Sequence, residues 1–416
     1  MTPSLVPGQD GATQQIAAAA IFLASYAALA MGKIPGMLID RAGVTLVGGS
    51  LMVAAGALPL EDAYKAIDLD TITLLLGMMI VVANLRLSGF FAVANAWIAT
   101  HTHRPAGLLA AVIAMSGVFS AFLVNDAICL VLAPLVADLA KATRRDPVPY
   151  LLAVALASNV GSAATITGNP QNIMIGSLSG IPYTTFAVAM APVALAGLVA
   201  TFVLLVGLYR REFFNHDRLV PVQPAARVNR VLIARSVVAV VAVIALFFAG
   251  QPPAKVVIIV AGLLLLTRRI RSTRIYAEID WSLLLMFSGL FIIVAGAEHA
   301  LLTPGRLTLV GQWHLERPWV LGASTAVLSN LVSNVPAVLM LKPFVAALPD
   351  TKQAWLVVAM ASTMAGNFSV LGSIANLIVI EKAARRGIAI SFWSYARVGI
   401  PLTLLTLCAG IGWLSR

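Results

Sequence analysis

Charged residues are scarce in this chain. Asp, Glu, Lys and Arg make up 11% of its 416 residues, whereas a soluble domain carries roughly a quarter. Hydrophobic residues make up 60%, and the mean hydropathy is +0.93. So few charges cannot cover the surface of a water-soluble protein, and this excludes a soluble enzyme. The composition predicts a polytopic membrane protein.

Cysteine is almost absent as well. The two cysteines, Cys129 and Cys408, each lie inside an apolar stretch, so they predict neither a disulfide framework nor a thiolate metal site. The sequence also contains no Walker motif, no HExxH motif and no nucleophile elbow. We therefore expect no enzyme activity and no cofactor, and we expect the energy for any work to come from an ion gradient or from a separate subunit.

Positive charge is plentiful but dispersed. The net charge is +11, yet the Lys and Arg residues form short clusters between apolar spans and not one basic face, which argues against nucleic-acid binding. Sorting them onto the two sides of a membrane places 21 of the 28 on one side. By the positive-inside rule this side is the cytoplasm. The sequence thus predicts a multi-pass protein of a bacterial-type inner membrane with both termini outside.

Apolar runs of about 20 residues can cross the hydrocarbon core, and the sequence offers ten. We expect them at Ile16–Met31, Leu38–Leu58, Leu69–Leu87, Tyr150–Leu178, Thr184–Leu208, Val231–Ala249, Val256–Leu266, Trp281–Ala297, Ala354–Ile380 and Phe392–Leu414. Two further apolar stretches, 105–141 and 318–349, each contain a central polar break. They are interpreted as re-entrant hairpins that enter from opposite faces.

The two halves of the chain match each other. Five spans and one hairpin per half is an odd number of crossings, so the second copy must be inverted, as in secondary transporters. The matched pairs are Asn125 with Asn334, Pro134 with Pro343 and Pro192 with Pro401, 209 positions apart, and Ser158–Asn172 with Ser362–Asn376, 204 apart. The predicted units are a first repeat (1–210, with hairpin 105–141 and broken helix 148–180), a basic cytoplasmic linker (211–230) and a second repeat (231–416, with hairpin 318–349 and broken helix 354–381).

Both predicted broken helices carry polar residues at mid-membrane depth. Irregular backbone is tolerated there only where it lines a cavity or is buried in protein, and the exposed ends of half-helices attract ions and polar ligands. Two hairpin tips and two breaks should meet near the midplane. The candidate substrate-binding residues are Asn125, Thr165, Gly168, Asn169, Asn172, Ser333, Asn334, Ser369, Gly372, Ser373 and Asn376. The alternative is that these side chains only satisfy the interrupted backbone.

Asp126 is the one carboxylate that the predicted topology places deep in the membrane. A lone intramembrane carboxylate is expensive and is by default a proton or cation site. The alternative is a helix N-cap, where Asp is favoured. We predict that Asp126 couples transport to protons or to another cation. Since no Lys or Arg falls at the predicted midplane, a neutral or weakly charged substrate fits best.

These motifs resemble the ion transporter superfamily. The resemblance rests on the tip Leu123-Val124-Asn125-Asp126, the segment from Ser158 to Asn172 and the second tip Ser333-Asn334-Val335-Pro336. Within this superfamily the sequence most resembles the ArsB-type arsenite permease branch, which is similar to the P-protein and NhaD sodium/proton antiporter branches. This resemblance implies ten spans, two opposed hairpins, a scaffold with a moving transport unit, and proton-coupled export of As(III) and Sb(III).

The sequence departs from that branch in one segment. Gly168-Asn169-Pro170-Gln171-Asn172 is nearer to P-protein-like and general anion-permease members. The Ser-Asn-Thr signatures of dicarboxylate/sodium symporters are missing at both tips. Efflux of trivalent arsenic and antimony is therefore the leading hypothesis. Sodium/proton antiport, sodium-coupled transport of a small inorganic or carboxylate anion, and a channel remain open.

The chemistry of As(III) suits amide ligands. At neutral pH it is the uncharged trihydroxide As(OH)₃, which donates and accepts hydrogen bonds, so side-chain amides can hold it without thiolates or positive charge. The predicted holders are Asn125, Asn334, Asn172 and Asn376. Expected partners are the lipid bilayer, the substrate with H⁺ or Na⁺, and a cytosolic ATPase subunit if the basic loop Arg210–Arg235 docks one. The chain is expected to be a monomer or a homodimer.

Overall fold

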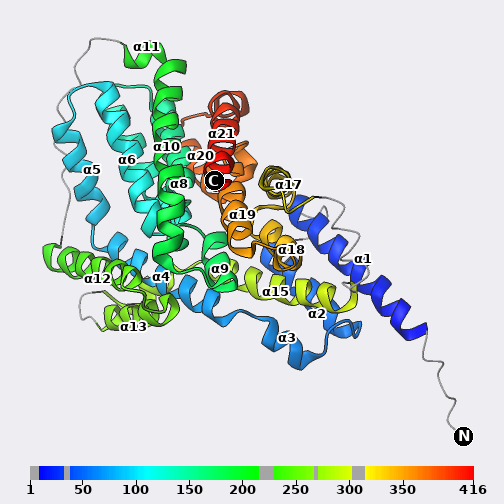
Figure 1. Cartoon of the computed structure of the whole chain (residues 1–416). Coiled ribbons are helices and arrows are strands. Elements are labelled where there is room, and N and C mark those ends of the chain that lie inside the picture. The colour runs from blue at the N-terminus through cyan, green and yellow to red at the C-terminus, as the bar shows by residue number, and fades with distance from the viewer. Residues whose placement is uncertain (1–8, 32–37, 215–228, 267–269, 302–313) are drawn as a thin grey trace, which may run out of the picture.

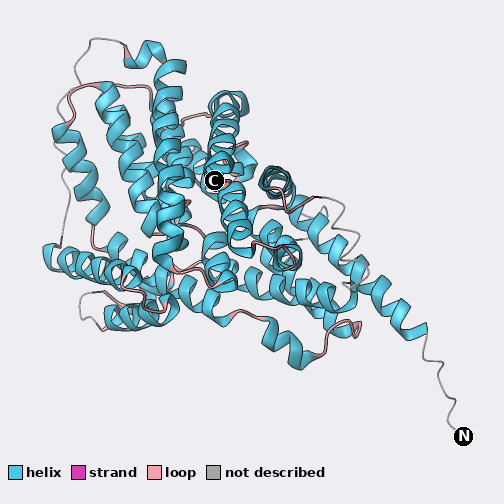
Figure 2. Ribbon diagram, viewed as in Figure 1, coloured by secondary structure: helices cyan, strands magenta, loops and turns pink. Residues whose placement is uncertain are grey.

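The computed structural model describes residues 9–31, 38–214, 229–266, 270–301 and 314–416. Throughout these residues the regular elements are helices, with no strand (Figure 2). Within the described part of the chain, seven helices are long and apolar enough to cross a membrane, and five shorter apolar helices of 10–17 residues accompany them. The predicted all-α fold with interrupted helices is confirmed. Most of the predicted basic linker 211–230 lies outside the described residues.

The helices of the first half are α1 (Gln9–Met31), α2 (Arg41–Ala54), α3 (Leu60–Ala66), α4 (Leu69–Leu87), α5 (Phe90–His101), α6 (Pro105–Phe122), α7 (Asn125–Ala142), α8 (Pro147–Ser162), η1 (Ile166–Gly168), α9 (Pro170–Ser179), α10 (Tyr183–Leu208) and α11 (Arg210–Phe213). Those of the second half are α12 (Arg230–Phe248), α13 (Pro253–Leu265), α14 (Ser272–Tyr276), α15 (Trp281–Leu301), α17 (Pro318–Val332), α18 (Asn334–Ala346), α19 (Thr351–Ala365), η3 (Val370–Gly372), α20 (Ile374–Ala384) and α21 (Phe392–Leu414).

Each half contains one helix that breaks and resumes. In the first half it runs α8, η1, α9, and in the second α19, η3, α20. The short 3-10 turn η3 begins 204 positions after η1, and α19 and α20 begin 204 positions after α8 and α9. This is the offset found in the sequence. The same capping chemistry starts both: Asp146 accepts from the Val148 N–H at 3.0 Å, and Asp350 accepts from the Gln353 N–H at 2.9 Å.

Each half also contains one helical hairpin, α6 with α7 and α17 with α18. The tips turn sharply, with Val124 at φ 27° and Ser333 at φ 80°. Positive φ is uncommon for residues other than glycine and is an outlier for a β-branched valine. Such a conformation persists only where surrounding contacts impose it, and it concentrates at functional sites. Both strained residues immediately precede the tip asparagines, Asn125 and Asn334.

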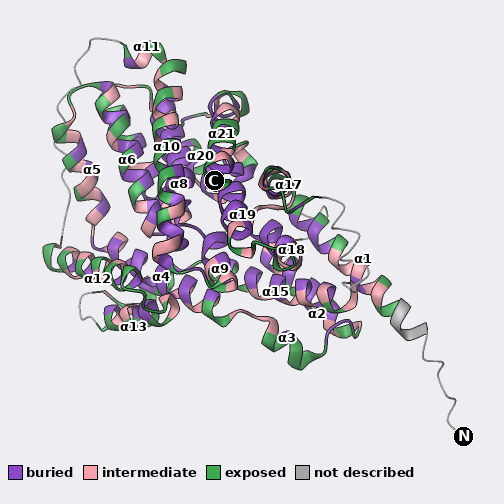
Figure 3. Cartoon of the chain, viewed as in Figure 1, coloured by how far each residue is buried: buried purple, intermediate pink, exposed green. Residues whose placement is uncertain are grey.

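The broken helices form the centre of the molecule. In Figure 1, α6, α8 and α10 stand side by side, and α19 and α21 lie next to them. The helices α2, α4, α13 and α15 lie across the end of this group, and α2 packs on α15 while α4 packs on α13. Figure 3 shows the buried residues gathered on α8, α9 and α19. Asn169, Asn367 and Asn376 of the two breaks are therefore enclosed by protein, as polar residues at this depth require. The second break is open beside them, where Phe368 and Leu371 are 39% and 75% exposed.

Close packing at this centre depends on glycine. A Cβ at Gly161 in α8 would overlap the backbone of Gly117 in α6. We expect Gly161→Ala to destabilise the protein by about 1–3 kcal/mol, because a packed core does not absorb an added methyl without moving backbone. Thermal unfolding of detergent-solubilised protein measures this. Gly107→Ala, in α6 with open space around it, is the matched control, and equal melting temperatures for the two variants would contradict this packing.

Three segments differ from the predicted spans. Helix α5 lies between α4 and the first hairpin, where no span was predicted, and its 12 residues reach only about 18 Å. Helix α2, predicted as a full span at Leu38–Leu58, has 14 residues, which cover about 21 Å. Helix α13, predicted as a full span at Val256–Leu266, has 13 residues, which cover about 20 Å. All three are shorter than a hydrocarbon core of about 30 Å. Apolar composition alone does not fix whether a helix crosses the membrane or stops partway.

Candidate functional site

The first half of the site is organised around Asn159, which lies in the last turn of α8 and is 2% exposed. Its Oδ1 accepts from the Nδ2 of Asn125 at 2.9 Å and from the Oγ of Ser373 at 3.0 Å. Its Nδ2 donates to the Oδ1 atoms of Asn367 and Asn376, both at 3.0 Å. One amide therefore joins the tip of the first hairpin to the break of the second half.

The direction of every amide in this chain of hydrogen bonds follows from the backbone. Asn376 donates through Nδ2 to the carbonyl oxygens of Gly366 at 2.8 Å and Ser369 at 3.1 Å. Carbonyls only accept, so the Oδ1 of Asn376 must face Asn159, and Asn159 must present Nδ2 to it. The Oδ1 of Asn159 then receives the Nδ2 of Asn125. The amide oxygen of Asn125 is left at the end of the chain.

That terminal oxygen has no hydrogen-bond partner. Asn125 is 4% exposed, and its Oδ1 is buried. The second tip repeats the feature, because the Oδ1 of Asn334 is also buried and unpartnered. A buried polar atom without a partner costs free energy. Two such acceptors at equivalent positions of the two tips suit a ligand that brings hydrogen-bond donors or positive charge.

A mirrored arrangement surrounds Thr363, the residue of α19 that lies 204 positions after Asn159. Its Oγ1 accepts from the Nδ2 of Asn169 at 3.1 Å and the Nε2 of Gln171 at 3.3 Å, and donates to the Oδ1 of Asn172 at 3.5 Å. Asn172 in turn donates to the carbonyls of the first break, on Ser162 and Thr165, at 3.2 and 3.0 Å. The last turns of α8 and α19, each just before the break of its own repeat, thus support the break of the opposite repeat.

The hairpins themselves dock on the break of their own half. In the first, the Thr165 hydroxyl donates to the carbonyl of Ala121 at the end of α6. In the second, Asn330 donates through Nδ2 to the carbonyl of Ala365 at 3.1 Å. Asn330 is the residue 209 positions after Ala121. The first tip therefore contacts both breaks, its own through Ala121 and the opposite one through Asn125.

Asp126 is half-buried, and its carboxylate faces the backbone N–H of Ala375 in the first turn of α20. The alternative interpretation of Asp126 as the N-cap of α7 is wrong, because Val124 occupies that position and no side chain caps the helix. The carboxylate instead contacts the second repeat, and it lies within electrostatic range of Asp280 at the start of α15. This places a titratable group in the first turn of α7, directly after Asn125.

A cavity of about 540 Å³ is lined by Asp280, the carboxylate within electrostatic range of Asp126. It lies between the N-terminal ends of α2 and α15 and reaches Ile374, the residue before Ala375. Its lining residues are Leu38, Ile39, Asp40, Arg41, Ala42, Asp280, Ser282, Leu283, Met286 and Ile374.

The remaining predicted site residues build the breaks. The side chains of Asn169, Asn172 and Asn376 form hydrogen bonds with groups of the breaks. They also bind the Thr363 hydroxyl or the Asn159 amide. Thr165 and Ser369 supply carbonyls, and Ser373 caps α20. Gly168 and Gly372 lie against the carbonyls of Ser162 and Gly366, where a Cβ would not fit. Ser333 forms the strained second tip. Asn125 and Asn334 retain free acceptors.

Sequence reasoning missed Asn159, Thr363 and Asn330 as members of the site. The signal for the first two was present, since both are polar residues in the last turns of largely apolar helices and occupy equivalent positions of the matched segments. Cys129, one turn after Asn125, pairs with Ser158 at 2.8 Å between Sγ and Oγ. This contact gives the thiol a structural partner.

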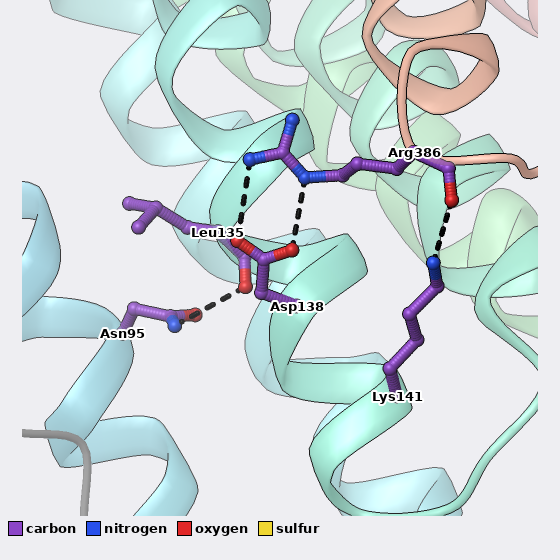
Figure 4. Close-up of polar contacts among 5 residues, drawn as sticks. All are labelled: Asn95, Leu135, Asp138, Lys141 and Arg386. Carbon is purple, nitrogen blue, oxygen red and sulfur yellow. Dashed lines mark hydrogen bonds and ion pairs between the residues drawn. The ribbon is translucent and has the colours of Figure 1, made fainter.

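Ion pairs and hydrogen bonds tie the elements of the site together (Figure 4). Asp138 in α7 accepts from the Nε and Nη2 of Arg386, after α20, at 2.9 and 3.2 Å, and Lys141 donates to the Arg386 carbonyl at 2.6 Å. The hydrogen bonds that Arg386 donates to Asp138 raise the pKa of the Arg386 guanidinium. The first hairpin and the second broken helix are thereby joined at this end. Asn95 of α5 donates to the carbonyl of Leu135 in α7 at 3.4 Å.

The second hairpin is tied to the neighbouring helices. Lys342 in α18 pairs with Glu298 in α15 at 3.2 Å between Nζ and Oε2. The Tyr26 hydroxyl of α1 donates to the carbonyl of Pro336 at 3.2 Å. These contacts join the hairpin to helices α1 and α15, which carry neither a break nor a hairpin.

A family model described as "Citrate transporter" matches residues 26–365. The chain belongs to this family, CitMHS. It is 30% identical to the 46 kDa membrane protein of Mycobacterium leprae, over 95% of this chain and 97% of the other. It is 29% identical to the silicon efflux transporter LSI3 of Oryza sativa subsp. japonica, over 91% and 93%. The fold resembles the YdaH transporter of Alcanivorax borkumensis, with a TM-score of 0.60, 14% identity and coverage of 96% and 97%.

Membership of the CitMHS family makes this protein a multi-pass membrane transporter and not an enzyme. It also confirms the resemblance to the ion transporter superfamily that the two tips and the broken segments indicated. The likeness to the YdaH transporter concerns the fold alone. The site must be interpreted from the residues that this chain places in it.

Proposed function

We propose that the protein exports trivalent arsenic and antimony as their uncharged hydroxides, in exchange for protons. The observation that carries the proposal is the pair of buried, unpartnered amide oxygens at the tips, on Asn125 and Asn334. As(OH)₃ and its antimony analogue carry several O–H donors that can satisfy such acceptors. The silicon efflux relative is consistent with this substrate class, because silicic acid is also a small uncharged polyhydroxide.

The charge of the site favours a neutral substrate over citrate. The tips and breaks, residues 121–126, 158–172, 330–336 and 362–376, contain no Lys or Arg. A tricarboxylate buried there would lack cationic partners, and an uncompensated charge in a low-dielectric site is costly. Arginine is the usual partner for carboxylates because its planar guanidinium binds them through two hydrogen bonds. An uncharged hydroxide needs only the hydrogen bonds that the amides offer.

Asp126 is the proposed coupling group. It lies against the second repeat at Ala375 and within electrostatic range of Asp280. Asp280 lines the cavity together with Asp40, on the side that the charge distribution predicts to be cytoplasmic. Substrate enters from this side when Asp126 has lost its proton. A proton that arrives from the opposite side replaces the substrate after the transport unit has moved. A carboxylate that changes charge alters the relative free energies of the two orientations.

Sodium/proton antiport is the second candidate, and one observation favours it. The free oxygen of Asn125 and the carboxylate of Asp126 belong to consecutive residues and are hard oxygen ligands, the kind that small cations prefer. A cation would satisfy the Asn125 acceptor as well as a hydroxyl donor does. Sodium-coupled anion transport, in line with the citrate description of the family model, is the third.

Flux in everted vesicles with an imposed proton gradient separates these candidates. Vesicles that contain the protein are compared with empty vesicles for uptake of As(III), Sb(III), silicic acid, sodium and citrate. Saturable uptake of As(III) or Sb(III) that collapses when the gradient is dissipated supports the proposal. Gradient-driven sodium uptake without metalloid uptake would replace it with antiport, and citrate uptake without metalloid uptake would replace it with anion transport.

A further inference from the structure

We propose that Asn159 is a positioning residue, which holds the Asn125 amide so that its oxygen and not its nitrogen faces the transported molecule. This inference rests on the proposed function and narrows it: the substrate must donate a hydrogen bond at the first hairpin tip. Asn159 itself is not expected to touch the substrate, because its amide already makes four hydrogen bonds within the protein.

A chain of hydrogen bonds that begins at the second break fixes which of the two amide atoms of Asn125 faces Asn159. The break carbonyls of Gly366 and Ser369 orient Asn376, Asn376 orients Asn159, and Asn159 takes the Nδ2 of Asn125. Reversing Asn125 would place its oxygen 2.9 Å from the oxygen of Asn159, which is repulsive. A free side-chain amide could offer a substrate either group. Asn159 removes that choice.

The second repeat shows what a shorter side chain at this position does. Thr363 replaces the amide with a hydroxyl that is one heavy atom shorter, and it still reaches Asn172, the counterpart of Asn376, at 3.5 Å. The break around it is intact, since Asn172 keeps both bonds to the carbonyls of Ser162 and Thr165. A threonine therefore supports a break from this position. The contact between Asn159 and the tip asparagine is the additional role of the longer amide.

Asn159→Thr separates the two roles, because it is expected to keep the break folded and to release Asn125. In vesicles, the KM for As(III) should rise about 10-fold, the size of one lost hydrogen bond to a substrate, with kcat within about 2-fold of wild type. The decisive comparison is a double-mutant cycle with Asn125→Ala. If Asn159 acts through Asn125, adding Asn159→Thr to Asn125→Ala should leave the KM unchanged.

A wild-type KM in Asn159→Thr would overturn the proposal, and so would effects of the two substitutions that multiply in the double variant. Melting temperatures establish that each variant is folded, and Asn159→Ser takes the place of Asn159→Thr in the cycle if the latter does not fold. If the wild-type protein moves sodium or citrate in place of As(III), the proposed substrate fails. The cycle then runs on that substrate and still decides whether Asn159 acts through Asn125.

Discussion

Replacement of Asp126 by asparagine is expected to abolish proton-driven accumulation of As(III), with the initial rate in everted vesicles at least about 100-fold below wild type. The carboxamide is nearly the same shape but cannot exchange a proton, and loss of a positioned proton carrier costs factors of this order. Asp138→Asn is the matched control. Asp138 lies on the same helix, α7, and pairs with Arg386 at its exposed end, so its variant should accumulate As(III) within about 2-fold of wild type.

Exchange of As(III) for As(III) without a gradient tests the proposed order of binding in the same variant. Because asparagine resembles the protonated aspartate, the form that the proposed cycle does not load with substrate, exchange should be lost in Asp126→Asn together with net accumulation. Accumulation at the wild-type rate would exclude Asp126 as the coupling group. Equal losses in Asp126→Asn and Asp138→Asn would indicate general damage to α7.

A cross-link should stop transport at the ion pair of Lys342 with Glu298 and leave it unchanged at the ion pair of Asp138 with Arg386. Cysteines at Lys342 and Glu298 join the second hairpin to α15, a helix with neither break nor hairpin. If hairpins and broken helices move as a unit against such helices, a short bifunctional thiol reagent at this pair should stop transport, with less than about a tenth of the flux remaining. Reductive cleavage of the linker should restore it.

The control cross-link lies within the proposed moving unit. Cysteines at Asp138 and Arg386 join α7 to the segment after α20, which ion pairing already holds together, so flux should stay within about 2-fold of the unlinked protein. Both pairs are tested with Cys129 and Cys408 replaced by serine or alanine. Full flux through protein cross-linked at Lys342 and Glu298 would contradict movement of the hairpin relative to α15.

Much of the fold follows from the sequence because membrane folding leaves few alternatives. Backbone groups in hydrocarbon must be satisfied within helices, so the apolar runs become helices, and Asp146 and Asp350 mark where the two broken helices begin. The segment with Gly168 and Asn169 could only interrupt a helix that protein encloses. The matched offsets in the sequence then give the equivalence of the two halves. Short helices such as α5 cannot be predicted in this way, because a helix that does not cross the membrane needs no apolar run of about 20 residues.

The site was less predictable because hydrogen bonds between distant segments decide its details. Sequence position grouped Asn125, Asn172 and Asn376 together as ligand holders. Folding gives them different tasks, since Asn172 and Asn376 close the breaks while Asn125 keeps a free oxygen. The partner that causes this difference, Asn159, contacts Asn376 across 217 positions of sequence. No local pattern reports which amide will meet which carbonyl.

Proton movement driven by substrate tests the central claim most directly. Purified protein is reconstituted into liposomes that enclose a pH indicator, with equal pH on both sides, and As(III) is added outside. Exchange of a neutral hydroxide for a proton predicts that the lumen becomes alkaline as As(III) enters, and that Asp126→Asn liposomes show no change. A lumen pH that ignores As(III) but responds to sodium or citrate would contradict metalloid/proton exchange as the function of this site.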